Sequence, residues 1–232
     1  MPYQWIIFDA DETLFRFDAF RGLQTLFADF GVHFTEQHYQ DYQAINQPLW
    51  QAYQDGQISA RELQHRRFAH WGAQLDISPG ILNSAFIQTM ADICQPLPGA
   101  HELLNALKGR VQMAIITNGF TELQQTRLER TGLATHFDAL VISEQVGVAK
   151  PDKAIFDHAL AAMGEPERQR VLMVGDNPHA DIKGGQNAGL QTCWLNADGA
   201  PRPEGVKPDH EVASLSQLQA LLFSQDKIPA PG

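Results

Sequence analysis

The chain has 232 residues, of which 44% are hydrophobic and 19% are charged, so it can bury a substantial core in one large domain or two small ones. Its 17 Lys and Arg residues are outnumbered by 27 Asp and Glu residues, and the formal net charge is −10 at pH 7. This charge weighs against a nucleic-acid polymer as partner, because such binding depends on neutralising many phosphates, whereas a small phosphorylated ligand needs only a metal ion and a few donors.

The N-terminal segment predicts a cytoplasmic protein. Residues 1–5 lead directly into an apolar stretch, with no basic leader and no cleavage-site pattern. No apolar run approaches the length that crosses a membrane, so we expect no membrane partner. Cys94 and Cys193 lie far apart without metal-ligand spacing, which is typical of small buried side chains in a reducing compartment. The sequence makes no prediction of oligomeric state.

Short apolar runs rich in β-branched residues predict the strands of an α/β core. They span residues 3–8, 111–117, 140–143, 171–174 and 192–195. Segments with helical spacing separate the later runs, so from residue 96 onward helices and strands alternate. This alternation predicts a Rossmann-like parallel sheet covered by helices on both faces.

Residues 16–95 differ in kind, because they contain amphipathic helical patterns and no convincing strand. Ser59 with Glu62 has the spacing of a capping box, and Pro79 suits the first turn of a helix. Three glycines are expected to end helices: Gly31, Gly56 and Gly72. We therefore expect an all-helical cap inserted into the core.

The predicted domain organisation follows from this interruption. The core comprises residues 1–15 and 96–224, and the cap comprises residues 16–95. The chain crosses between them near residues 15–18 and 95–98, which are hinge candidates. Residues 225–232 contain proline and glycine with little to bury, so we expect a flexible tail.

Carboxylates follow two of the predicted strands. Asp9 and Asp11 come directly after the first strand, and Asp176 and Asp181 follow the strand at 171–174. Ligands of an open parallel sheet bind just beyond the carboxyl ends of its strands, so these side chains are expected to share one crevice. Oxygen ligands of this kind suit Mg²⁺.

Two further segments supply groups that bind phosphate. Thr117 and Asn118 end the strand at 111–117, where a hydroxyl and backbone N–H groups at a helix N-terminus could hold phosphate oxygens. Lys150 precedes Pro151, which disfavours helical geometry at the lysine. Taken alone, a Thr-Asn-Gly turn or a single lysine carries little functional information.

Together these four segments resemble the motifs of the haloacid dehalogenase-like superfamily. The chain presents Asp-x-Asp-x-Thr at residues 9–13, Thr-Asn at 117–118, Lys-Pro at 150–151 and Gly-Asp with a second Asp at 175–181, in the order of that family. The whole chain is similar to the bacterial pyrimidine 5′-nucleotidases within it. The stretches that carry this closer resemblance are 8–15, 41–46, 48–50, 115–120, 127–133, 141–151 and 171–176.

The resemblance implies a phosphatase that forms an aspartyl-phosphate. Asp9 is the implied nucleophile, and Asp11 is the implied acid and base. Magnesium, with manganese as a possible substitute, is expected on Asp9, Asp176 and the backbone carbonyl of Asp11, and Asp181 supports this site from behind. Phosphate is expected on Thr117, Asn118 and Lys150, while Thr13 orders the turn after the first strand.

The implied substrate is a small phosphorylated metabolite, in the closer resemblance a pyrimidine nucleotide. Phe17, Trp50 and Tyr53 are candidate substrate contacts, because aromatic side chains near the base of the cap can stack on a pyrimidine ring. The second acid, Asp11, favours hydrolysis over halide displacement, since superfamily members that displace halide lack it.

Two other functions remain open at this point. A phosphatase for sugar phosphates or other phosphometabolites would use an identical core site and differ only in its cap. A non-hydrolytic signalling domain that accepts phosphate on aspartate shares the Asp, Thr and Lys arrangement, but it carries the phosphorylated residue after a later strand and lacks a large helical insert.

Overall fold

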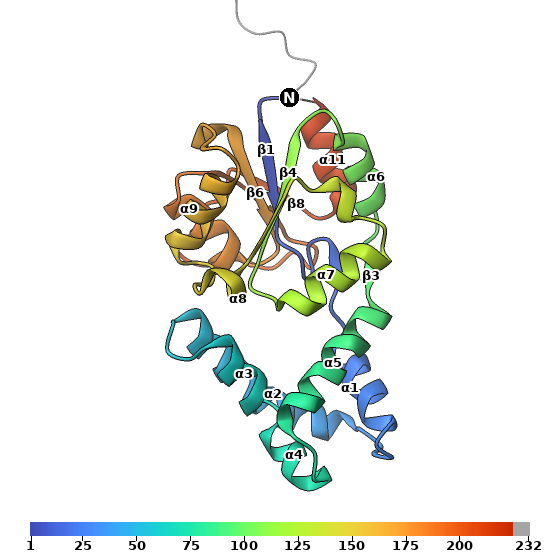
Figure 1. Ribbon diagram of the computed structural model, residues 1–232. Coiled ribbons are helices and arrows are strands. Elements are labelled where there is room, and N and C mark those ends of the chain that lie inside the picture. The colour runs from blue at the N-terminus through green and yellow to red at the C-terminus, as the bar shows by residue number, and fades with distance from the viewer. Residues whose placement is uncertain (225–232) are drawn as a thin grey trace, which may run out of the picture.

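The computed structural model describes residues 1–224, so the predicted tail at 225–232 lies outside the described residues. Its centre is a six-stranded sheet of order β5-β4-β1-β6-β7-β8 in which every neighbouring pair is parallel (Figure 1). The strands are β1 (Trp5–Phe8), β4 (Gln112–Thr117), β5 (Ala139–Ile142), β6 (Val171–Gly175), β7 (Gln191–Leu195) and β8 (His210–Val212). The predicted Rossmann-like core is confirmed, and β8 is a strand that the sequence analysis missed.

The central strand β1 explains why its sequence is an unbroken apolar run. All four of its residues are buried. Ile6 and Phe8 belong to the apolar cluster on one face of the sheet, and Trp5 and Ile7 belong to the cluster on the other. Successive side chains of a strand point to opposite faces, so a strand that is covered on both sides needs an apolar residue at every position.

Helices cover both faces of the sheet. The first face packs against α6 (Ala100–Leu107), α7 (Thr121–Arg130) and α11 (Leu215–Ser224). The second packs against α8 (Ser143–Val146), α9 (Lys153–Ala162) and α10 (Gly184–Asn187). Shorter helical turns complete the core: η1 (Ala134–His136), η2 (Arg168–Arg170) and the π-helical η3 (Pro178–Lys183). Within residues 1–224, none of the helices has the length and apolar character that crossing a membrane requires.

A separate group of helices lies beyond the carboxyl ends of the strands (Figure 1). Its members are α1 (Ala19–Ala28), α2 (Glu36–Gln54), α3 (Ala60–Arg66), α4 (Ala69–Leu75) and α5 (Pro79–Ile93). They share an apolar cluster, in which the Phe27 and Phe34 rings stack at 5.0 Å and Trp71 packs on Phe27 at 4.3 Å. Phe120, Leu123 and Ala149 of the sheet domain also belong to this cluster. The capping box of Ser59 and Glu62 is formed, and Pro79 opens α5. The predicted helical insert is confirmed.

The two crossings between the helical group and the sheet are not simple linkers. β2 (Phe15–Arg16) and β3 (Gln95–Pro96) pair antiparallel and form a two-stranded ribbon. Phe15 is buried against the sheet core, so one strand of the ribbon is anchored there. Strands of two residues have no periodicity to detect, and the sequence analysis therefore treated these crossings only as hinge candidates.

The prediction that Gly72 ends a helix is wrong. Gly72 lies inside α4, which ends instead at Asp76 in a left-handed conformation with φ of 53°. A Cβ on Gly72 would lie 2.7 Å from the carbonyl oxygen of Ile77 and 3.1 Å from the ring of Pro79. This glycine permits a close approach of the following turn, which a helix-ending pattern cannot distinguish from a C-terminal cap.

Candidate active site

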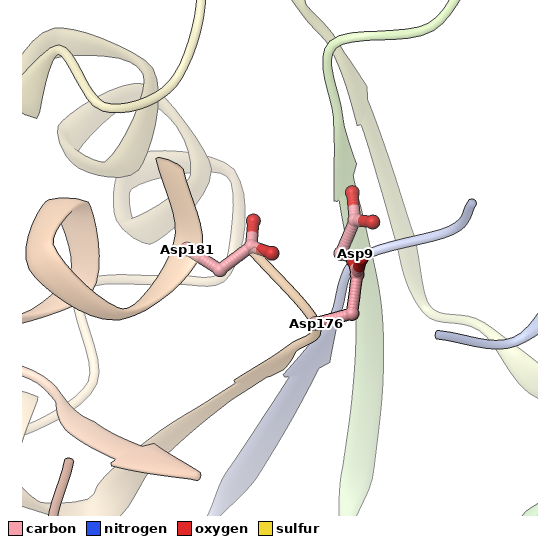
Figure 2. Close-up of side chains that lie close together, drawn as sticks. All are labelled: Asp9, Asp176 and Asp181. Atoms are coloured by element: carbon pink, nitrogen blue, oxygen red, sulfur yellow. The ribbon is translucent and has the colours of Figure 1, made fainter. Parts of the chain in front are cut away.

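Three carboxylates meet at the carboxyl edge of the sheet. Asp9 directly follows β1, Asp176 directly follows β6, and Asp181 lies in η3. β1 and β6 are neighbours in register, with Phe8 opposite Val174, so their ends coincide. One carboxylate oxygen of each aspartate lies within 4.8 Å of the others. Figure 2 shows Asp181 reaching from its helix toward the strand ends that carry Asp9 and Asp176.

Lys150 connects two of these carboxylates. Its Nζ donates to Oδ1 of Asp9 at 2.5 Å, to Oδ1 of Asp181 at 2.6 Å and to the carbonyl of Ile116 at 2.8 Å. An ammonium group has three hydrogens, so all its donors are used. Asn118 holds the lysine backbone, because its Oδ1 accepts from Lys150 N at 2.7 Å and its Nδ2 donates to Lys150 O at 2.9 Å. These two bonds fix the Asn118 side chain against the backbone of Lys150.

The turn after β4 is built around Thr117. This residue is buried, and its Oγ1 accepts a hydrogen bond from the Gly119 amide at 3.0 Å. A Cβ on Gly119 would lie 2.2 Å from the amide nitrogen of Gln124 in the following helix α7, so a larger residue there would displace that side chain. Thr117, Asn118 and Gly119 all line the cavity that contains the carboxylates.

Thr13 joins the two acidic turns. It is fully buried, and its Oγ1 accepts from the Asp176 amide at 3.0 Å and donates to Asp176 Oδ1 at 3.3 Å. Trp194 Nε1 donates to the Asp176 carbonyl at 2.8 Å. These bonds fix the position of Asp176, and they link Thr13, in the turn after β1, to the turn after β6.

Asp181 is fixed equally firmly. Besides its bond to Lys150, its Oδ2 accepts from the Asn177 amide at 3.0 Å. Asn177 itself caps η3 by accepting from the amides of His179 and Ala180. Gly175 lies against the Asp181 carboxylate so closely that a Cβ there would collide with it.

Asp11 belongs to the same cavity but has a different partner. Its Oδ1 accepts a hydrogen bond from Nη1 of Arg127 at 2.5 Å, and its side chain is 32% exposed while that of Arg127 is 1% exposed. Arg127 is not among the site residues predicted from the sequence. Its position was a usable signal, because it falls with Leu123, Gln124 and Leu128 on the buried face of α7, where an unpaired charge is unfavourable.

The cavity at this site has a volume of about 250 Å³. Its lining includes Phe17 and Trp50 of the predicted aromatic contacts, and also Gln54, which the sequence analysis did not identify. Tyr53 is not among the lining residues. Its hydroxyl instead bonds Ser143 Oγ at 2.7 Å and ties the helical group to the core. The Trp50 ring stacks on Phe120 at 5.3 Å with an interplanar angle of 29°.

The electrostatics of the cluster favour binding of a cation. Burial raises the pKa of Asp9 to about 8, with Lys150 opposing the shift and the neighbouring aspartates adding to it. Burial and then Asp181 raise the pKa of Asp176 to about 7. For Lys150 burial lowers the pKa, but Asp181 and Asp9 outweigh it and the net shift is upward. When all three carboxylates are ionised beside one ammonium, two negative charges are left, and a divalent cation with oxygen ligands would neutralise them.

Comparisons with known proteins agree with this geometry. A family model for haloacid dehalogenase-like hydrolases matches residues 3–189. Pyrimidine 5′-nucleotidase YjjG of Escherichia coli (strain K12) is 60% identical over 222 residues, which cover 96% of this chain and 99% of that protein. Pyrimidine 5′-nucleotidase PynA of Streptococcus pneumoniae (strain ATCC BAA-255 / R6) is 34% identical, covering 94% of each chain.

A solved structure extends the likeness to three dimensions. The HAD-hydrolase YfnB of Bacillus subtilis, crystallised with bound magnesium, superposes with a TM-score of 0.82 at 31% identity. The match covers 95% of this chain and 98% of that one, and interdomain movement is reported for that protein.

Proposed function

The chain belongs to the haloacid dehalogenase-like hydrolases, and from this premise we propose that it is a magnesium-dependent phosphatase that hydrolyses pyrimidine nucleoside 5′-monophosphates. The observation that carries the proposal is Asp9 at the end of the central strand, bound through one oxygen to the buried Lys150 and facing Asp176. The 60% identity to a pyrimidine 5′-nucleotidase over nearly the full length supports the choice of substrate.

The magnesium site that we propose uses the free oxygens of the cluster. Within residues 1–224, the hydrogen bonds to the carboxylates of Asp9 and Asp176 engage Oδ1, which leaves Oδ2 of each as a ligand atom. Both oxygens of Asp181 are engaged, so it supports the site without binding the ion directly. The backbone carbonyl of Asp11 is the further protein ligand proposed. When bound, Mg²⁺ supplies the charge that lets an anionic nucleophile approach a phosphate, and Mn²⁺ is a proposed substitute.

The reaction that we propose has two halves. The Asp9 carboxylate attacks phosphorus, the ester P–O bond breaks, and Asp11 gives its proton to the departing 5′ oxygen. Water then attacks the phosphorus of the phospho-aspartate and gives a proton to Asp11, the P–O bond to Asp9 breaks, and phosphate leaves. Thr117 and the backbone amides after it hold the phosphate oxygens throughout, and Lys150 gives one of its three hydrogen bonds to a phosphate oxygen in place of one to the protein.

The cavity wall suggests how a nucleoside is held. Trp50 has one face covered by Phe120, so its ring is fixed and can carry a pyrimidine on its other side, with Phe17 nearby. Gln54 lies one helical turn beyond Trp50 and lines the same cavity. Its amide can donate and accept at a base edge, so we propose it as the hydrogen-bonding partner of the pyrimidine. Tyr53 we assign to fastening the helical group.

We propose that residues 16–95 form a mobile cap on a core of residues 1–15 and 96–224. Most of the apolar contacts of each part lie within that part, and the β2–β3 ribbon joins the two, with Phe120, Leu123 and Ala149 of the core packing against the cap. Cap closure would exclude water from the reaction. The protein is then a cytoplasmic enzyme whose partner is a small phosphorylated metabolite.

Two alternatives are weaker. A phosphatase for sugar phosphates would share every core residue, but a base-sized aromatic wall would then be unused. A non-hydrolytic phospho-acceptor is disfavoured because Asp11 lines the cavity beside Asp9.

The testing experiment is a turnover panel with Mg²⁺ present. Pyrimidine monophosphates, purine monophosphates and ribose 5-phosphate are each incubated with enzyme, and phosphate release is measured. We expect pyrimidine nucleotides to give the highest kcat/KM, with EDTA and Asp9→Asn each abolishing release while the protein stays folded. Faster turnover of ribose 5-phosphate would exclude the nucleotidase, and full activity of Asp9→Asn would exclude the nucleophile.

A further inference from the structure

Arg127 is a buried cation placed where three segments of the chain meet. Its side chain is 1% exposed, and its Nη1 donates to Oδ1 of Asp11 at 2.5 Å. Its guanidinium carbon lies 4.5 Å from the centre of the Phe15 ring, in the first strand of the ribbon between the helical group and the sheet. The guanidinium therefore contacts both the turn after β1 and the ribbon.

Gln124 fixes the orientation of this guanidinium. Its Oε1 accepts from Nε of Arg127 at 3.1 Å and from Nη2 at 2.6 Å. Because the oxygen faces the arginine, the amide nitrogen is turned toward Gly119, where it is buried without a hydrogen-bond partner among the described residues. Gln124 thus fixes one orientation of the arginine, and it packs against Gly119 in the turn that follows Thr117.

Stability alone does not explain a charge at this position. A buried arginine loses its hydration, and well-packed apolar residues at such sites are often neutral or stabilising by comparison. Within residues 1–224, Asp11 is the only carboxylate that forms an ion pair with Arg127. Asp11 is partly exposed, whereas Arg127 is buried and held by Gln124. Arg127 therefore determines where the Asp11 carboxylate lies.

We propose that Arg127 is a positioning residue that acts on the reaction only through Asp11, an inference that rests on the proposed function. One Asp11 oxygen is bound to Nη1, and the carboxylate is held in the cavity so that Oδ2 exchanges the proton with the leaving oxygen and with water. Misplacing a reacting group by about 1 Å can cost about 100-fold in rate, so the loss of this one bond is expected to be large.

The test is a double-mutant cycle between Arg127 and Asp11. Arg127→Met, Asp11→Asn and the double variant are assayed with uridine monophosphate and with p-nitrophenyl phosphate, whose better leaving group keeps slow variants measurable. We expect Arg127→Met alone to lower kcat by about 10- to 100-fold with little change in KM, and to add less than about twofold in the Asp11→Asn background. Arg127→Lys is expected to recover part of the loss.

The control is Arg130→Met on the same helix. Arg130 pairs with Asp92 at the surface, its side chain is 45% exposed, and its loss should leave kcat unchanged. Thermal unfolding is followed for every variant, and Arg127→Lys carries the test if Arg127→Met does not fold. Equal loss in both backgrounds, or no loss, overturns the positioning role. Unchanged turnover of Asp11→Asn would instead overturn the proposed function, in which Asp11 is the acid and base.

Discussion

The ammonium nitrogen of Lys150 lies 2.5 Å from Oδ1 of Asp9, although 141 residues separate the two in the sequence. The lysine is 1% exposed, and Asp181 accepts a second of its hydrogens. Burial of an ammonium is costly unless it is paired, and here two carboxylates pair it. The pair therefore brings the nucleophile and its counter-charge into one buried position before any substrate binds.

Replacing Lys150 with Met is expected to lower kcat by about 100- to 1,000-fold, because a preorganised donor to the transferring phosphate is lost and the carboxylates repel one another. Steady-state kinetics at saturating Mg²⁺ measure this. Lys153→Met is the matched control, since that lysine is 51% exposed and pairs with Asp157 on its own helix. A Lys150→Met enzyme with full kcat would remove the lysine from the mechanism.

Replacing Thr13 with Val is expected to weaken Mg²⁺ binding about tenfold, because the hydroxyl that orients Asp176 is lost while the side-chain shape is kept. The Mg²⁺ concentration that gives half-maximal activity measures the effect. Thr25→Val is the control, since the Thr25 hydroxyl donates to the carbonyl of Arg21 on the surface of α1. Unchanged Mg²⁺ dependence in Thr13→Val would mean that the hydroxyl does not position Asp176.

The parts of the site that sequence reasoning could predict are those that follow from local order. Asp9 and Asp176 each end an apolar run that must be a buried strand, and parallel strands bring their carboxyl ends to one edge. No distance was needed for that inference. The same reasoning predicted the helical insert, because its periodicity changes at residue 16 and returns near residue 96.

The missed features depend on contacts between distant segments. Arg127 gains its meaning from Asp11, 116 residues away. The buried face of α7 indicates that this charge needs a partner, but nothing near it in the chain indicates which one. Gln54 is an ordinary helix residue until α2 is placed over the cavity. Tyr53, on the same turn, bonds Ser143 and faces away from the cavity lining, a difference that helical spacing alone could not resolve.

A pair of glycine substitutions tests the packing around Asp181. Gly175→Ala is expected to lower both stability and activity, since its Cβ would collide with the Asp181 carboxylate that Lys150 binds. Gly80→Ala, in the exposed first turn of α5, meets nothing closer than 3.7 Å and is expected to stabilise the protein by about 0.5 to 1 kcal/mol through helix propensity. Thermal unfolding of both variants measures the contrast, and stabilisation by Gly175→Ala would show that Asp181 can move freely.

The raised pKa values predict how pH affects the protein when Mg²⁺ is removed. Burial raises the pKa of Asp9 from 3.8 to about 8 and that of Asp176 to about 7, whereas the unfolded chain keeps ordinary carboxyl groups. Between the ordinary carboxyl pKa of the unfolded chain and the raised pKa of the folded protein, the folded state binds more protons than the unfolded state. The stabilisation that these protons give is present at low pH and is lost as pH rises through about 7 to 8.

In EDTA, the melting temperature is therefore expected to fall as pH rises from about 6 to about 8.5. The part of this fall that the Asp9→Asn variant does not show is the contribution of the Asp9 carboxyl group. Mg²⁺ needs the ionised carboxylates, so the stabilisation it gives should grow over the same interval, because fewer protons must be displaced. Thermal unfolding in EDTA and in Mg²⁺ across this range measures both trends. Asp9→Asn should flatten the slope in EDTA, since it removes the group with the highest of these pKa values and keeps its shape. An Asn variant with the wild-type slope would mean that Asp9 is ionised in the folded protein before any metal binds.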